Sequence, residues 1–224
     1  SHVIVKARKL DNLNGQEFFI SKSFREEILP DIDVGVYAVF DGHSGAKAAS
    51  FCSKKFHKYI VKENKYIMRE NWPKALKKAV MKMDTAFLEK ASRLDDDDCC
   101  TLCAVVQVNN VLYSVNLGNS KAVLCRKGET VTLTSAHYPT NEEELARIVE
   151  NGGSLTFTGE FPYVNGALRI SRAIGIRPLK QPKQIISSEP EIQEYHLTPE
   201  DLFFVIASDG LWDVMSETEV IKFV

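Results

Sequence analysis

Two apolar runs in this chain end in the same way, and these endings constrain the fold more than any other feature. Segment 34–40, VGVYAVF, runs into Asp41 and a glycine; segment 202–207, LFFVIA, is followed after one serine by Asp209 and a glycine. Runs rich in β-branched and aromatic residues are typical of buried strands. Two carboxylates at the ends of core strands can meet although 168 positions separate them. Such a pair usually needs a divalent cation to be tolerated, so the pattern points to chemistry.

Further apolar segments predict additional strands, and turn residues between them predict hairpins. Asn109-Asn110 and Gly118-Asn119-Ser120 are both hairpin signals. Consecutive strands joined by hairpins form antiparallel sheets. The expected strands are 17–21, 34–40, 103–108, 111–117, 121–125, 130–133 and 202–207.

Four amphipathic segments predict helices. The first follows Gly45, and the second has Asn71 as its N-cap with a proline in the first turn. The third opens with a capping box at Thr140 and ends at Gly152-Gly153, and the fourth opens with a capping box at Ser216. Hairpin-rich strands with helices between them indicate an α+β domain. Two antiparallel sheets stacked as a β-sandwich, with helices on the outside, accommodate all of these elements.

Length and composition indicate one ordinary globular domain. The 224 residues can bury a sizeable core, and a net charge of -2 gives no electrostatic case for binding nucleic acid or an anionic membrane. No apolar stretch is long enough to cross a bilayer. The fourth helix carries no stop signal before Val224. We therefore expect residues 1–224 to be a single, monomeric catalytic domain that lacks its C-terminal segment.

The cysteines and a run of aspartates each allow a metal-site hypothesis. Five cysteines without regular spacing argue against a disulfide framework and for a reducing compartment, the cytoplasm or nucleus. Cys99, Cys100 and Cys103 resemble half of a zinc site, but a second pair of ligands is missing, and buried packing is the preferred interpretation. The acidic run 95–98 is expected to form a solvated loop.

The segment after the first apolar run carries the residue types that metal-assisted proton transfer needs. Asp41 offers hard oxygen ligands for magnesium or manganese. Gly42 lets its own carbonyl approach a metal closely, because no Cβ intervenes. His43 is placed to give a proton to a leaving group near the metal. A plain strand-end turn is the alternative for this segment alone.

Several motifs together resemble the metal-dependent serine/threonine protein phosphatases of type 2C. They stand in the order that the family has them and span nearly the whole chain. They are 37–45 YAVFDGHSG, 117–124 LGNSKAVL, 146–148 ARI, 152–153 GG, 168–175 LRISRAIG, 188–192 SEPEI and 207–213 ASDGLWD.

The resemblance implies a β-sandwich with two divalent cations, Mg²⁺ or Mn²⁺, at one end. Asp41 would bridge both metals, the Gly42 carbonyl would bind one, and Asp209 would bind the other. A water activated by the metals would attack a phosphoserine or phosphothreonine of a protein substrate in line. His43 would protonate the departing alkoxide.

The chain departs from the family pattern at several site positions. Gln16-Glu17 is the best match for the acidic pair near the start, so a first metal glutamate is replaced by Gln16, while Glu17 could still hold a metal-bound water. Asn119 stands where the family has an aspartate for a third, weaker metal. Arg8 is the nearest match for the phosphate-binding arginine, and the last metal aspartate would lie beyond Val224.

Two functions follow from these departures. Asp41, Asp209 and His43 are retained, which favours an active phosphatase with a divergent and weakened site. The alternative is a pseudophosphatase that acts as a protein-binding or scaffold module. Other phosphatase chemistries fit worse, because no cysteine is followed by an arginine six positions on and no Gly-Lys-Ser/Thr loop is present. His137 is interpreted as a loop residue, and Arg169 and Arg172 as residues that flank a strand and hold loops.

Overall fold

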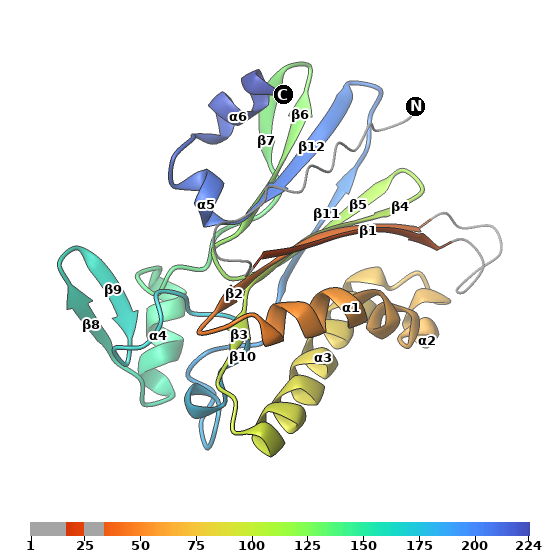
Figure 1. Cartoon of the computed structure of the whole chain (residues 1–224). Coiled ribbons are helices and arrows are strands. Elements are labelled where there is room, and N and C mark those ends of the chain that lie inside the picture. The colour runs from red at the N-terminus through yellow and green to blue at the C-terminus, as the bar shows by residue number, and fades with distance from the viewer. Residues whose placement is uncertain (1–16, 25–33) are drawn as a thin grey trace.

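A computed structural model describes the backbone of residues 17–24 and the backbone and side chains of residues 34–224. Gln16 and Arg8 lie outside the described residues. Two antiparallel sheets stack face to face, with helices on both outer faces (Figure 1). The predicted α+β sandwich is therefore confirmed.

The larger sheet has seven strands in the order β10-β3-β2-β4-β5-β11, with β1 paired to the free side of β2. Its strands are β1 (Glu17–Phe24), β2 (Val34–His43), β3 (Cys99–Cys100), β4 (Leu102–Val108), β5 (Val111–Leu117), β10 (Ile174–Gly175) and β11 (Glu191–His196). The smaller sheet, β12-β6-β7, consists of β6 (Lys121–Arg126), β7 (Glu129–Thr132) and β12 (Asp201–Ala207). A separate hairpin pairs β8 (Leu155–Thr158) with β9 (Phe161–Val164).

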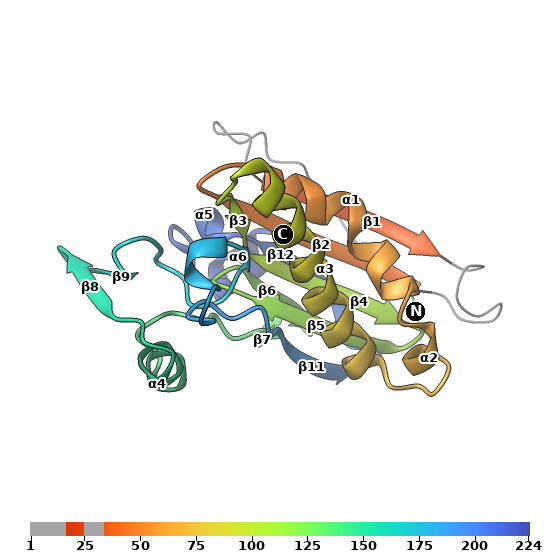
Figure 2. The ribbon, with the colours of Figure 1, turned by 90° about the horizontal axis from the view of Figure 1, so that it is seen from below.

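Helices cover the outer face of each sheet. α1 (Lys47–Val61), α2 (Asn64–Ile67) and α3 (Trp72–Leu94) lie under the larger sheet, as Figure 2 shows from below. α5 (Asp209–Trp212) and α6 (Glu217–Phe223) lie against the smaller one. α4 (Glu142–Glu150) and the β8–β9 hairpin project to one side, and a 3₁₀ turn (Arg177–Leu179) follows β10.

The alternation of side chains along β4 shows how the layers are held together. Ala104 and Val106 pack towards α1 and α3, whereas Cys103 and Val105 pack towards the smaller sheet. Successive strand residues point to opposite faces, so a strand that is apolar throughout must be covered on both sides. The continuous apolar character of this strand thus requires both a helical layer and a second sheet.

The predicted helix boundaries are largely correct. Asn71 caps α3, because its side-chain oxygen accepts a hydrogen bond from the Lys74 amide at 3.2 Å, and the capping box at Ser216 opens α6. The capping box at Thr140 is wrong. α4 begins after Asn141, and the side-chain amide of Asn141 instead donates to the Ala136 carbonyl at 2.9 Å, which holds the preceding turn.

Two loop predictions need correction. Gly118-Asn119-Ser120 does not form a hairpin: β4 and β11 occupy both sides of β5, so the chain crosses to the smaller sheet instead. The acidic run is only half solvated, because Asp96 and Asp98 are buried. Lys47 explains this, since its ammonium lies 2.7 Å from Asp96 and its amide donates to Asp98 at 2.8 Å.

All five cysteines are buried and free, as the packing interpretation predicts. In the described part of the chain, no helix has both the length and the apolar character needed to span a membrane.

Candidate active site

The ends of β2 and β12 meet at one cavity of about 470 Å³. Asp41 lies near the end of β2, and Asp209 opens the one-turn helix α5 after β12. Both carboxylates line this cavity, together with Gly42, His43 and Asn119. Five residues that the sequence predicted for the site, from three separate stretches of the chain, are therefore brought together.

His43 is oriented by the residue that it follows in the chain. Its Nδ1 lies 3.2 Å from the backbone carbonyl of Asp41, and its Nε2 lies 4.0 Å from the Asp41 carboxylate. The carbonyl is an acceptor, so Nδ1 carries a proton in this arrangement. The ring is thereby held at the mouth of the cavity, where its other nitrogen, Nε2, can face a bound substrate.

The turn after His43 requires its glycine. Gly45 has a φ of +154°, and a Cβ at this position would lie 2.3 Å from the Asp98 carboxylate oxygens. That carboxylate also receives the Lys47 amide, the first amide of α1. Close approach of Asp98 to the start of α1 thus fixes the path of the chain out of the site.

Asp209 is held by Asn119 from the loop between the two sheets. The side-chain amide of Asn119 donates to Oδ2 of Asp209 at 2.8 Å, and Asn119 is buried. Oδ1 of Asn119 is also buried, and within residues 34–224 it has no hydrogen-bond partner. An unpaired buried carbonyl oxygen beside a carboxylate is a fitting donor for a cation or for a water bound to one.

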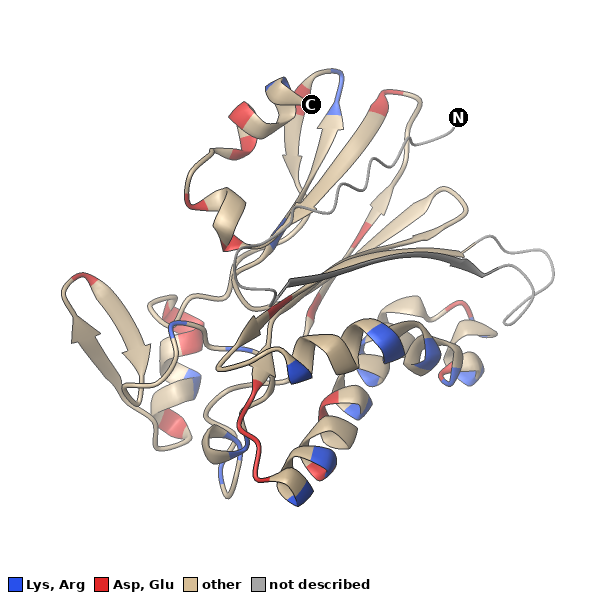
Figure 3. Ribbon diagram, viewed as in Figure 1, with Lys and Arg blue, Asp and Glu red and all other residues tan. Residues whose placement is uncertain are grey.

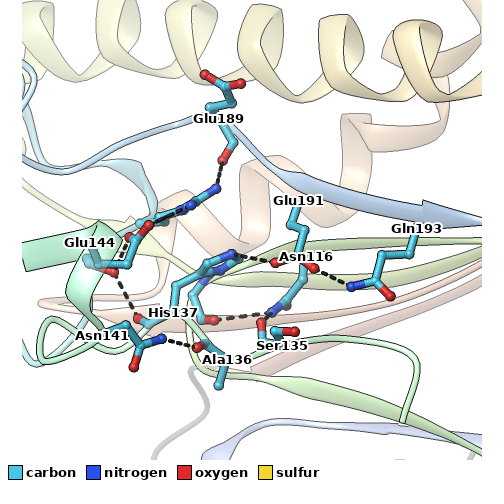
Figure 4. Close-up of polar contacts among 12 residues, drawn as sticks. Asn116, Ser135, Ala136, His137, Asn141, Glu144, Glu189, Glu191 and Gln193 are labelled. Carbon is cyan, nitrogen blue, oxygen red and sulfur yellow. Dashed lines mark hydrogen bonds and ion pairs between the residues drawn. The ribbon is translucent and has the colours of Figure 1, made fainter. Parts of the chain in front are cut away.

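The loop that carries Asn119 is fastened by a buried histidine (Figure 4). The His137 amide donates to the Gly118 carbonyl at 2.9 Å, and the Gly118 amide donates to Nδ1 of His137 at 3.2 Å. Nε2 of His137 faces the Glu191 carboxylate at 3.3 Å. Burial, followed by the positive charge of Arg172, lowers the pKa of His137, so the neutral ring that accepts from Gly118 is the favoured form. His137 is therefore a loop residue, as predicted, and its contacts with Gly118 position the loop that carries Asn119.

Glu144 on α4 connects this loop to the rest of the site frame. The buried carboxylate accepts hydrogen bonds from the Ser171 hydroxyl at 2.5 Å, from Arg147 at 2.8 Å and from Nε of Arg172 at 3.0 Å. The same hydroxyl lies 3.0 Å from the His137 carbonyl. Burial alone would raise the pKa of Glu144, but the hydrogen bonds from Arg172 and Ser171 lower it below its usual range.

The structure bears differently on three other residues that the sequence analysis named. Glu17 pairs with Asp41 in the register of β1 and β2, which puts its backbone beside the site, while its side chain lies outside the described residues. Arg172 holds loops, as predicted, since it also donates to the Glu189 carbonyl at 3.0 Å. The segment between Arg169 and Arg172 is not a strand, and Arg169 lines the cavity instead.

Several cavity residues are missing from the sequence-based prediction. Asp213 lines the cavity four positions after Asp209, because the single turn of α5 places residues i and i+4 on the same side. That spacing was a usable signal. Tyr138, Tyr163 and Arg169 also line the cavity, and nothing in the local sequence indicates this.

The donors present suit a hard cation. The cavity offers only oxygen ligands of the kind that such a cation prefers: the carboxylates of Asp41, Asp209 and Asp213, the Gly42 carbonyl and the unpaired side-chain oxygen of Asn119. In the described portion of the chain, no group of three histidine, cysteine, aspartate or glutamate side chains is gathered closely enough to hold a metal by itself. The residues thus fit divalent cations that also bind water and substrate oxygens.

Comparison with known proteins identifies the family. The sequence model described as Protein phosphatase 2C matches residues 6–224. The chain belongs to the protein phosphatase 2C family. Protein phosphatase 2C homolog 3 of Schizosaccharomyces pombe is 37% identical over 196 residues, which cover 85% of this chain and 46% of that protein. Probable protein phosphatase 2C 7 of Oryza sativa is 32% identical over 211 residues, or 94% of this chain and 54% of the relative.

The chain spans about half the length of these curated relatives. Among solved structures, the serine-threonine phosphatase 2C from Toxoplasma gondii superposes with a TM-score of 0.83 at 21% identity, covering 94% of this chain and 78% of that one. At this identity the likeness is one of fold, and it agrees with the stacked sheets described above.

Proposed function

We propose that this protein hydrolyses phosphoserine or phosphothreonine in protein substrates and requires divalent cations, Mg²⁺ or Mn²⁺. The observation that carries the proposal is the convergence of Asp41, His43 and Asp209 on one cavity from two different sheets. Membership of the protein phosphatase 2C family supports it.

Each residue of the cavity has a task in this reaction. Asp41, the Gly42 carbonyl and Asp209 would hold two cations, which when bound supply charge neutralisation and an activated water for attack on phosphorus. His43 holds its proton beside Asp41 and gives it to the serine or threonine oxygen that leaves. Asn119 keeps Asp209 aimed at the cavity through its hydrogen bond.

The site is proposed to be weaker than that of a family member with a full set of carboxylates. Asn119 contributes no charge where the family has an aspartate, and Gln16 stands in for a glutamate. Each missing carboxylate reduces the attraction of the site for a divalent cation. The second candidate, a pseudophosphatase that binds proteins, rests on these same two positions.

The test is turnover of phosphothreonine peptides by the protein with added Mn²⁺ or Mg²⁺ and after chelation. We expect metal-dependent release of phosphate, and a loss of at least a hundredfold in Asp209→Asn, because that change removes a metal carboxylate while it preserves the side-chain shape. Asp97→Asn, an exposed acid away from the cavity, is the matched control and should leave turnover unchanged. Full turnover in chelator would refute the mechanism, and no turnover with either metal would favour the pseudophosphatase.

A further inference from the structure

The cavity has two walls of different chemistry. One wall, formed by the ends of β2 and β12, carries carboxylates and His43. The opposite wall comes from the segment around the β8–β9 hairpin and consists of aromatic and apolar side chains with one cation, Arg169. The first wall accounts for phosphate chemistry, and the second wall has no part in that account.

Arg169 in this second wall is held by an aromatic ring of the hairpin. Its guanidinium lies 4.0 Å from the centroid of the Phe161 ring, a distance typical of cation–π contact. Phe161 is the first residue of β9 after the hairpin turn, and the hairpin projects away from both sheets (Figure 1). The ring thus anchors the guanidinium to the hairpin at the edge of the cavity that Arg169 lines.

The charge of Arg169 is not neutralised by the described residues. No carboxylate in residues 34–224 lies within ion-pair distance of it, in contrast to Arg147 and Arg172, which both pair with Glu144. Figure 3 shows that the β8–β9 hairpin is nearly free of charged residues. Its single charged residue is Glu160, at the turn. Arg169 therefore presents an available positive charge and a planar set of donors to the cavity.

We propose that Arg169 is a specificity-determining residue that binds an acidic group flanking the phosphorylated residue of the substrate. The inference rests on the proposed function. An extended peptide advances about 3.3 Å per residue, so a phosphoresidue at the carboxylate wall places its neighbours against the opposite wall. The acidic group is an aspartate or glutamate side chain or a second phosphate, because guanidinium binds carboxylate and phosphate by the same bidentate geometry. Without Arg169, such a group would meet no lysine or arginine among the residues that line the cavity.

The test compares pairs of phosphothreonine peptides that differ only by Glu or Gln beside the phosphoresidue, with a third peptide that carries phosphoserine there. We expect the protein to prefer the acidic peptides by about fivefold in kcat/KM, as for an exposed charge pair, through a lower KM. Arg169→Gln should abolish this preference while turnover of the Gln peptide is retained, and Arg169→Lys should keep part of it. Arg93→Gln, an exposed arginine at the far end of α3, is the matched control.

Phe161→Leu provides a second variant that keeps the exposed apolar surface but removes the ring, and it should reduce the preference without affecting the Gln peptide. An undiminished preference in Arg169→Gln would overturn the inference. An equal loss of turnover for all peptides would also overturn it, because Arg169 would then act on the scissile phosphate. If the protein hydrolyses none of the peptides, the proposed function fails, and the peptides can then be used as stable ligands. Their Kd values, measured by fluorescence anisotropy in Mn²⁺, then test the inference separately. Equal Kd values for the Glu and Gln peptides overturn it, and a preference for the Glu peptide that Arg169→Gln abolishes supports it.

Discussion

Glu144→Gln should destabilise the protein strongly, because Glu144 is the single negative charge that two partly buried arginines share. The carboxylate takes hydrogen bonds from Ser171, Arg147 and Arg172 at 2.5–3.0 Å. Nε and Nη1 of Arg147 are buried with no hydrogen-bond partner in the described residues, and Nη2 donates to Glu144 and to the neutral Ser171 carbonyl, so Glu144 supplies the counter-charge of this guanidinium. Glutamine keeps the shape but replaces an acceptor oxygen with a donor that faces other donors.

The expected loss can be estimated from the size of such interactions. Removing one partner from a buried charged network costs about 3–5 kcal/mol, because the remaining charges stay desolvated. Taking about 3 kcal/mol, and roughly 3 °C per kcal/mol for a domain of this size, the melting temperature should fall by roughly 9 °C. Glu143→Gln, exposed on the same helix, is the control and should stay within about 0.5 kcal/mol of the parent.

The pH dependence gives the decisive reading of this prediction. The pKa of Glu144 is lowered in the folded protein, so its contribution is fully present above the unfolded value of about 4.3 and disappears as the pH falls through the folded value. The difference in unfolding free energy between parent and Glu144→Gln, measured by urea titration, should therefore be constant near pH 7 and shrink in acid. A difference below about 1 kcal/mol at pH 7, or one that grows in acid, would refute the reasoning.

Three further changes test other parts of the structure. Lys180→Met should lower the free energy of unfolding by about 3 kcal/mol in urea denaturation, because the buried carboxylate of Asp84, which lies 2.6 Å from the Lys180 ammonium, loses its counter-charge. Adding Asp84→Leu to this variant should recover most of the loss, and strict additivity of the two changes would contradict this expectation. Asn119→Asp replaces the 2.8 Å hydrogen bond to Asp209 with a contact between two carboxylates. The melting temperature should therefore fall without metal and rise more steeply with Mn²⁺, and turnover should need less metal. Identical metal titrations of both proteins would show that position 119 does not limit the site. Ser216→Ala should cost about 1 kcal/mol by removing the capping box of α6, and an unchanged midpoint would mean that this helix adds nothing to stability.

The strands and main helices were predictable because their signals are local. The apolar residues of β4 and the apolar stripe of α3 directly indicate which side chains are buried. The runs of β-branched and aromatic residues in β2 and β12 predict these strands, and the point where each run stops gives the end of the strand. The β8–β9 hairpin was missed although a glycine separates its short strands. Its residues are mostly exposed and include Pro162, so neither hydrophobic alternation nor strand propensity marks it.

The errors arose where long-range placement decides the outcome. Gly118-Asn119-Ser120 has the composition of a hairpin turn, and only the occupied sides of β5 force it to connect the two sheets. The acidic run looked solvated because the sequence does not reveal that Lys47 lies beside Asp96.

The site divides in the same way. Asp41, His43 and Asp209 could be predicted because each sits at the end of a recognisable strand, where a short motif identifies it. Tyr138 and Arg169 could not, because a cavity wall is formed by segments that meet only in the folded protein. The Glu144 network was missed for the same reason, since its members come from two segments that are far apart in the sequence.

Phosphate release is proposed to depend on one divalent-cation site that Asp41 and Asp209 form together. The most direct test is an anomalous-scattering map from crystals of the protein grown with Mn²⁺. We expect manganese peaks within about 2.1–2.3 Å of the carboxylates of both Asp41 and Asp209, and loss of the Asp209 peak in Asp209→Asn crystals. Peaks elsewhere, with the two carboxylates free of metal, would contradict it.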